Sequence, residues 1–240
     1  LYSSNEKNKN ELSAQLDLVV SCSSASAADY RRRDGISDQA LEYYSRTYPG
    51  EDISKDDLFY YIYAVLHSAD YRMRFVDNLA KELPRIPCVR SADDFWRLSQ
   101  GGRSLADLHL HYESVEMYPA TVMSGNRALT DADFRVEKMR HAKSGIDKDL
   151  GVIHYNNRIT ITGIPADAYE YVVNGKSAIE WVMERQCVKV DKASGIVNDA
   201  NDWALETMEN PRYPLDLLLR IITVSVETVK IVNGLPTLDI

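Results

Sequence analysis

The pattern His-x-His at His109 and His111 is the first set of side chains that could bind a metal ion. On a β-strand both rings would share one face, whereas on a helix they would point about 200° apart. The apolar residues before them recur with a helical period, and no third ligand of suitable spacing is near. We therefore predict a structural role for this pair and no metal site. The isolated His67, His141 and His154 are expected at the surface or bonded to a neighbour.

The segment Asn210-Pro211-Arg212-Tyr213 is similar to the Asn/Asp-Pro-Pro-Tyr/Phe motif of methyltransferases that act on adenine amino groups. In that motif the polar residue grips the amino group and the aromatic ring stacks on the flipped base. Arg212 stands where the motif has its second proline, and no glycine-rich strand–turn–helix loop precedes the segment. The residues are therefore predicted to form a turn that leads into a helix beginning near Pro214.

Other catalytic and cofactor motifs are missing from the sequence. Gly175-Lys176-Ser177 matches only the end of a G-x-x-x-x-G-K-[ST] phosphate loop, and Glu170 occupies the position of its first glycine. There is no G-x-S-x-G elbow, and no pair of carboxylates stands out from an ordinary acidic surface. The chain is therefore predicted to have no catalytic residues and to bind no cofactor of its own.

Composition narrows the class of protein further. The 240 residues carry a net charge of −8, which excludes a basic footprint over the whole surface. The three cysteines are far apart and form no C-x-x-C pair, which excludes a zinc ribbon and fits a reducing cytoplasm. No apolar stretch approaches the roughly 20 residues of a membrane helix, so a cytoplasmic protein without membrane contact is expected.

Positive charge is nevertheless concentrated in two stretches. Residues 72–103 hold seven basic and four acidic residues, and residues 135–158 hold six basic and three acidic residues. Arg, Lys and Asn side chains suit phosphates and base edges, although an ordinary solvated surface is the alternative. The candidate DNA-binding residues are Arg72, Arg74, Arg103, Lys138, Arg140, Lys143, Lys148, Asn156, Asn157 and Arg158.

The periodicity of apolar residues predicts an α+β fold, with a mainly helical scaffold and a small antiparallel sheet inserted around 117–163. Residues 37–116 and 164–234 show the helical period, and residues 117–163 show period two. Strands are predicted at Thr121–Met123 and Phe134–Met139.

A tight hairpin is predicted within the period-two region. The strands Val152–Tyr155 and Arg158–Thr162 flank Asn156-Asn157, and asparagine tolerates the positive φ of a two-residue turn.

The helices have recognisable ends. Ser54, followed by acidic residues, predicts an N-cap, and Ser177 with Glu180 forms a capping box. A long terminal helix is expected from Pro214 to the stop signal Asn233-Gly234. The pair Gly101-Gly102 is expected to weaken or kink the helix that contains it.

Several long segments together resemble the C-terminal specificity region of type ISP (single-polypeptide, type I-like) restriction–modification enzymes. The resemblance covers roughly residues 30–236. It rests on the segments Asp56–Arg72, Leu83–Pro87, Leu105–Leu110, Tyr112-Glu113, Tyr169–Trp181 and Arg220–Val229.

The resemblance implies two regions in this chain: an irregular N-terminal segment, 1–29, and a target-recognition domain, 30–240. The chain begins with Leu rather than Met, and no basic segment precedes Leu16–Val20, so a piece of a longer polypeptide without a signal peptide is expected.

The longer polypeptide would contain a nuclease, an ATP-driven DNA translocase of the helicase type and an adenine-N6 methyltransferase. Those parts would use S-adenosylmethionine, ATP and Mg²⁺. The present chain would recognise a short asymmetric sequence in double-stranded DNA, dock on the methyltransferase domain and position the target adenine.

The position of the recognition residues remains a hypothesis at this stage. Tyr60, Tyr61, Tyr63 and the turn 83–87 are predicted to be scaffold, because they fit a buried helix stripe and a rigid exit. Sequence recognition is then expected from the polar loop 124–148 and the hairpin tip. Two alternatives stay open: a helical protein-interaction module that never touches bases, and a small-molecule enzyme with an unrecognised pocket.

Overall fold

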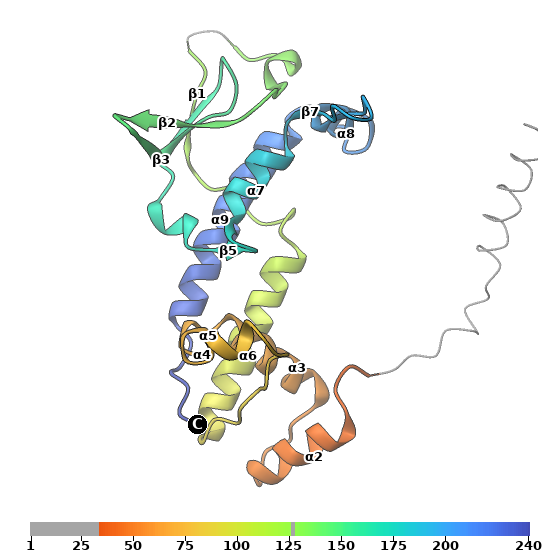
Figure 1. The fold of residues 1–240 in the computed structure, drawn as a ribbon, viewed down its shortest axis with the longest axis vertical. Coiled ribbons are helices and arrows are strands. Elements are labelled where there is room, and N and C mark those ends of the chain that lie inside the picture. Colours follow the sequence, from red (N-terminus) through yellow and green to blue (C-terminus); the bar gives the residue numbers. More distant parts are fainter. Residues whose placement is uncertain (1–33, 126–127) are drawn as a thin grey trace, which may run out of the picture. The chain divides into compact units, whose positions relative to one another are not determined.

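The computed structural model describes residues 34–125 and 128–240 (Figure 1). The predicted irregular segment 1–29 lies outside the described residues. The chain divides into two compact units, Leu1–Ala40 and Leu41–Ile240. Within residues 34–40, the Ser37 hydroxyl accepts the Ala40 amide at 3.1 Å, at the start of α2 (Asp38–Thr47). The predicted α+β class is confirmed.

A pair of long helices, α3 (Lys55–His67) and α6 (Ala92–Leu110), packs side by side. The short helices α4 (Ala69–Arg74) and α5 (Val76–Leu79) lie between them in the sequence. The predicted cap of α3 is confirmed, because the Ser54 hydroxyl accepts the amide of Asp57 at 3.2 Å.

The tandem glycines of α6 permit the close approach of these two helices. A Cβ atom at Gly102 would lie 1.9 Å from the Tyr60 carbonyl oxygen, so only glycine fits there without a shift. Helix α6 continues through both glycines over 19 residues. The predicted weakening or kink at Gly101-Gly102 stays a prediction, and the close packing against α3 accounts for glycine at position 102 despite its low helix propensity.

Tyrosines build the core around α3 and explain why this residue type is so frequent. The Tyr61 ring stacks on Phe95 with centroids 4.9 Å apart, and both are fully buried. Buried tyrosine needs a partner for its hydroxyl, and the segment 85–89 supplies carbonyl oxygens. Tyr71 donates to Arg85 (2.8 Å), Tyr44 and Tyr61 to Pro87 (3.3 and 2.6 Å), and Tyr48 to Val89 (2.5 Å). The scaffold role predicted for Tyr61 and the turn 83–87 agrees with these bonds.

A four-stranded antiparallel sheet follows, with the strand order β1-β4-β3-β2. Its strands are β1 (Thr121–Met123), β2 (Arg140–Ser144), β3 (Asp147–His154) and β4 (Thr160–Thr162). Ile153 and Ile161 point into the core, where α9 contributes Leu215, Leu218 and Ile222. The predicted strand 121–123 is confirmed.

Two predictions for this region are wrong. Residues 134–139 form no strand, since the 3₁₀ helix η2 (Asp131–Phe134) comes first and the next strand begins at Arg140. The backbone there bonds mainly to the side chains of Asn156 and Asn201, and the Glu137 carbonyl accepts one bond from the Val188 amide at 3.0 Å. The β3–β4 connection is a five-residue loop, 155–159, rather than a two-residue turn at Asn156-Asn157.

The last third of the chain contains strands as well as helices. The 3₁₀ helix η3 (Ala166–Tyr169) is followed by the hairpin β5 (Val172–Val173) and β6 (Lys176–Ser177). Asn174 and Gly175 form its turn with φ values of 50° and 79°, both positive as a type I′ turn requires. The purely helical prediction for 164–234 is wrong, because strands of two or three residues are too short to show period two.

A second small hairpin and three helices complete the fold. Helix α7 (Ala178–Arg185) precedes the hairpin of β7 (Val188–Val190) and β8 (Val197–Asp199), and α8 (Ala200–Glu206) follows it. Ser177 caps α7 and Gly234 ends α9 (Tyr213–Asn233), as predicted. Figure 1 shows α7 lying along α9, whose first half packs under the sheet.

Candidate nucleic-acid interface

The segment that leads into β2 is held by a short capped turn. The carboxylate of Asp133 accepts bonds from the amide and the hydroxyl of Thr130, both at 2.8 Å. This closes η2 and directs the following residues, Arg135 to Met139, toward the start of β2. Since Asp133 is buried, its carboxylate is a fixed point of the segment.

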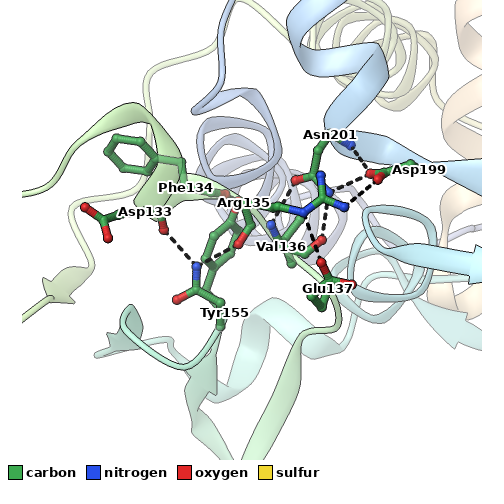
Figure 2. A network of polar contacts seen from close by, with 9 residues as sticks. Asp133, Phe134, Arg135, Val136, Glu137, Tyr155, Asp199 and Asn201 are labelled. Carbon is green, nitrogen blue, oxygen red and sulfur yellow. Dashed lines mark hydrogen bonds and ion pairs between the residues drawn. The ribbon is translucent and has the colours of Figure 1, made fainter.

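The β3–β4 loop forms hydrogen bonds with the segment between η2 and β2 (Figure 2). The Asn156 amide group donates to the carbonyl oxygens of Asp133 and Arg135, each at 2.9 Å. Its oxygen accepts the amides of Arg158 and Ile159 at 2.9 and 2.8 Å. These four bonds use both donors and both acceptor positions of the side chain. Asn156 therefore shapes the loop instead of presenting its amide to a ligand.

Helix α8 holds the segment from its other side. The buried Asn201 accepts the Val136 amide at 2.8 Å and donates to the Val136 carbonyl at 2.9 Å, as a neighbouring strand would do. Figure 2 shows Arg135 between Asp199, at 2.7 Å, and Glu137, at 3.0 Å.

These ion pairs shift the titration of both partners. The hydrogen bond to Asp199 raises the pKa of Arg135. Burial opposes ionisation of Asp199, but the bonds from Arg135 and Asn201 outweigh it and lower the pKa of that carboxyl. The guanidinium and the carboxylate are therefore both charged at neutral pH.

The 3₁₀ helix η2, the start of β2 and the β3–β4 loop line an open cleft of about 560 Å³, named here the basic cleft. Its rim combines basic, acidic and amide side chains from η2, the start of β2 and the β3–β4 loop. It is lined by Ala132, Asp133, Arg135, Glu137, Lys138, Arg140, His154, Asn156, Asn157 and Arg158. Five of the residues predicted from the sequence thus come together: Lys138, Arg140, Asn156, Asn157 and Arg158.

The cations of the basic cleft differ in what already binds them. Arg158 pairs with Asp133 at 3.1 Å, and Arg135 is held as described. Within residues 34–125 and 128–240, the side chains of Lys138, Arg140 and Asn157 have no ion pair or hydrogen bond, and all three are exposed. Lys138 and Arg140 can therefore bind an anionic partner without giving up an existing contact.

Two residues of the cleft were missed as candidates. Arg135 was counted in the basic stretch 135–158 but was not among the candidate DNA-binding residues. His154 looked isolated in the sequence, and only the strand register brings it beside Arg140. The period-two pattern of β3 was the available signal, because it predicts that Val152 and His154 share one face.

The other predicted residues lie outside the basic cleft. Arg103 joins α6 to α3 through Asp57 at 2.5 Å and covers the Tyr60 ring, so its guanidinium supports the helix pair. Arg74 pairs with Asp70 at 2.7 Å on α4. Lys148 reaches Glu180 of α7 at 3.3 Å.

Two predicted cations outside the cleft remain without an ion pair in the described ranges. Lys143 lies opposite Lys148 in the β2–β3 ribbon. Arg72 lines a separate groove of about 580 Å³ between α4, the β5–β6 hairpin and α9. The two basic stretches of the sequence therefore do not form one continuous surface of unpaired charge.

The histidine pair has structural partners. Both ring nitrogens of His109 bond to hydroxyls, of Tyr63 at 2.8 Å and of Thr228 at 2.9 Å, whereas His111 pairs with Asp107. In the ranges that the structure describes, no three side chains of His, Cys, Asp or Glu gather closely enough to hold a metal ion.

The Asn210–Tyr213 segment is a helix start, as predicted. The Asn210 side chain accepts the Arg212 amide at 2.9 Å and donates to Asp216 at 3.2 Å. Arg212 binds the same carboxylate at 2.7 Å. The polar groups that would grip a base in an adenine methyltransferase are therefore committed to the first turns of α9.

Comparison with known proteins gives the family. The Type ISP C-terminal specificity domain matches residues 1–217 of this chain. The chain belongs to that family. The resemblance in the sequence covered residues 30–236. The matched range begins earlier than residue 30 and ends earlier than residue 236. No curated protein sequence matches the specificity domain.

Three solved structures resemble the specificity domain. A nuclease-deletion mutant of the Type ISP restriction–modification enzyme LlaGI, in complex with a DNA substrate mimic, is 44% identical over 80% of this chain, with a TM-score of 0.68. The ATP-dependent Type ISP enzyme LlaBIII bound to DNA is 38% identical over 83%, with a TM-score of 0.70. A DrdV–DNA complex is 34% identical over 84%, with a TM-score of 0.69.

The specificity domain spans only a small part of these relatives: 15% of the LlaGI chain, 12% of LlaBIII and 20% of DrdV. Among its described residues, no helix combines the length and the low charge that a bilayer crossing requires.

Proposed function

We propose that this specificity domain recognises a sequence in double-stranded DNA through the basic cleft, without catalysis of its own. The observation that carries the proposal is the pair of exposed, unpaired cations Lys138 and Arg140 on a segment fixed from both sides. Because the backbone that carries these cations is already held in place, only their side chains lose conformational freedom when they bind phosphates or guanine edges. The relatives LlaGI, LlaBIII and DrdV were solved as complexes with DNA or a DNA mimic, which supports the proposal that this domain binds DNA.

The remaining activities belong to the rest of a longer polypeptide under this proposal. The domain docks on an adenine-N6 methyltransferase that uses S-adenosylmethionine, and directs an endonuclease and translocase that use ATP and Mg²⁺. Its role is to place the target adenine in the methyltransferase site. The family description supports membership of a restriction–modification enzyme, since it names a specificity domain of the Type ISP class.

The test is binding of the 240-residue chain to a pool of randomised duplexes, with the bound fraction sequenced. We expect binding that weakens with salt and enriches one asymmetric motif. Lys138→Ala combined with Arg140→Ala should weaken binding about tenfold or more, because a hydrogen bond to a charged group contributes about 1.5–3 kcal/mol.

Lys81→Ala is the matched control, since Lys81 is exposed and lies outside the basic cleft. This substitution should leave the affinity unchanged. If the double variant bound and selected DNA like the unmodified chain, the assignment to the basic cleft would be wrong.

A protein-interaction module is the second candidate, because the β7–β8 hairpin and α8 expose apolar side chains. Val190, Val197 and Trp203 are each more than half exposed. A module that docks only through this surface would bind the methyltransferase in a salt-insensitive way and would select no sequence from the duplex pool.

A further inference from the structure

The outer face of the four-stranded sheet is partly open to solvent, with exposed residues on β1, β2 and β3 and half-buried residues on β3 and β4. Strand alternation sends Ile153 and Ile161 into the core and sends their neighbours in the sequence to the opposite face. The outward residues are short or uncharged apart from one arginine. They are Thr121 and Met123 of β1, Arg140 of β2, Val152 and His154 of β3, and Thr160 and Thr162 of β4.

The strand register aligns four of these side chains in a row, named here the sheet row. Arg140 pairs with His154, His154 with Thr160, and Thr160 with Met123. Arg140 and His154 also line the basic cleft, so the sheet row continues directly from it. The side chains of Met123, Thr160 and His154 beside the cations Arg140 and Lys138 suit the base edges of DNA next to its phosphates.

A hydrogen bond inside the sheet row orients one imidazole. His154 Nδ1 lies 3.1 Å from the hydroxyl oxygen of Thr160. In the described part of the chain Nε2 has no protein partner, and the side chain is exposed. The threonine thus fixes one edge of the ring and leaves the other edge for a ligand.

The length of the sheet row fits the major groove. Adjacent strands lie about 4.8 Å apart, so the row of four side chains spans about 14 Å. That length corresponds to about four base pairs at 3.4 Å each. Strands β1 and β4, with three residues each, are about 10 Å long, close to the groove width of about 12 Å.

We propose that the sheet row is the base-reading surface of the domain, with His154 and Thr160 as specificity-determining residues. The row lies along the major groove of duplex DNA, and Arg140, at the end of the row beside the basic cleft, binds the adjacent phosphate backbone together with Lys138. His154 Nε2 bonds to a base edge, and Thr160 positions the ring. The inference rests on the proposed DNA-binding function and adds the residues that select the sequence.

The experiment compares the motifs that the full 240-residue chain and its variants select from a randomised duplex pool. His154→Ala and Thr160→Val should each lose preference at the same base position, by about fivefold or more. The double variant should lose no more than His154→Ala alone. Affinity for unselected duplex and its salt dependence should stay within about twofold, because no phosphate contact is removed.

His111→Ala is the control, because His111 is likewise exposed but lies at the end of α6. His154→Gln, which keeps a polar side chain, repeats the test if the alanine variant unfolds on heating earlier than the unmodified chain. Motifs unchanged in the His154 and Thr160 variants would overturn the inference while leaving the proposed function intact. If the unmodified chain selected no motif, the proposed function would fail first and the inference with it.

Discussion

The asparagines near the basic cleft differ in what their amides bind. Asn156 and Asn201 each bond to backbone groups of the segment 133–136 and to further protein groups, whereas Asn157 is exposed and unbonded among the described residues. In the sequence, Asn156 and Asn157 looked equivalent. Only the fold shows that one builds the loop and the other is available to a ligand.

Asn201→Ala should destabilise the domain by about 2 kcal/mol or more. The substitution leaves the buried amide and carbonyl of Val136 without partners, and each unsatisfied group costs about 1–3 kcal/mol. Urea unfolding measures the difference. Asn157→Ala is the control and should change the free energy of unfolding by less than about 0.5 kcal/mol. Equal effects of the two substitutions would contradict the assigned role of Asn201.

His109 should make stability depend on pH. Burial, together with the neighbouring His67, lowers the pKa of His109 to about 4. An unfolded histidine titrates near pH 6.5. Between about pH 6.5 and 4 the unfolded chain therefore binds a proton at this residue that the folded chain does not bind. The free energy of unfolding therefore falls as the pH decreases through that range.

The His109→Gln variant cannot titrate and should lose less stability than the unmodified chain between pH 7 and pH 5. Urea titrations at the two pH values give the comparison. A residual dependence will persist in the variant, because burial also lowers the pKa of His67 and of His141. Identical pH dependence in both proteins would show that His109 is not buried as described.

At the scale of elements, Gly102 sets the distance between α3 and α6. Gly102→Ala should lower the free energy of unfolding by about 1–3 kcal/mol, since the new Cβ meets the rigid Tyr60 carbonyl at 1.9 Å. Gly101→Ala is the matched change, because its Cβ meets only the flexible end of the Leu235 side chain. Thermal unfolding of the two variants separates these cases, and a larger loss for Gly101→Ala would refute the packing argument.

The elements that the sequence predicted well are those whose signals are local. The caps at Ser54 and Ser177 and the stop at Gly234 were identifiable because each depends on residues within one helical turn. The irregular structure of the segment 134–139 could not be predicted, because Asn156 and Asn201, whose side chains bond to its backbone, are distant in the sequence.

The same distinction applies to the candidate site. Lys138, Arg140 and Arg158 meet at the open end of the β2–β3 hairpin, in a region where the sequence predicted antiparallel strands but placed the hairpin at 152–162 instead. Arg103 pairs instead with Asp57, 46 residues earlier, and nothing in the sequence pattern indicates that contact. The assembly of the basic cleft was thus predictable in part, and the pairing of individual cations was not.

At the scale of the whole molecule, the basic cleft attracts DNA, whereas the net charge of −8 repels it. Salt screens both the repulsion of DNA by the acidic body and the attraction by the basic cleft. If Lys138 and Arg140 each neutralise one phosphate, replacing both by alanine should reduce the slope of log affinity against log salt by about 1.8.

Fluorescence-anisotropy titrations at several salt concentrations measure that slope. Lys81→Ala removes the same kind of charge elsewhere and should leave the slope unchanged. A slope that fell equally in both variants would mean that general charge, rather than the basic cleft, governs binding.

Helix α9 contacts both the sheet and the helical scaffold of the domain. Leu215 and Leu218 pack under the sheet, and Thr228, further along, bonds to His109 of α6. A helix of 21 residues is a rod of about 31 Å, so the sheet is anchored to the helical scaffold by a stiff shared element. The backbone of the sheet row is thus ordered before any partner arrives. Most of the conformational entropy lost on binding DNA then comes from exposed side chains such as Lys138 and Arg140.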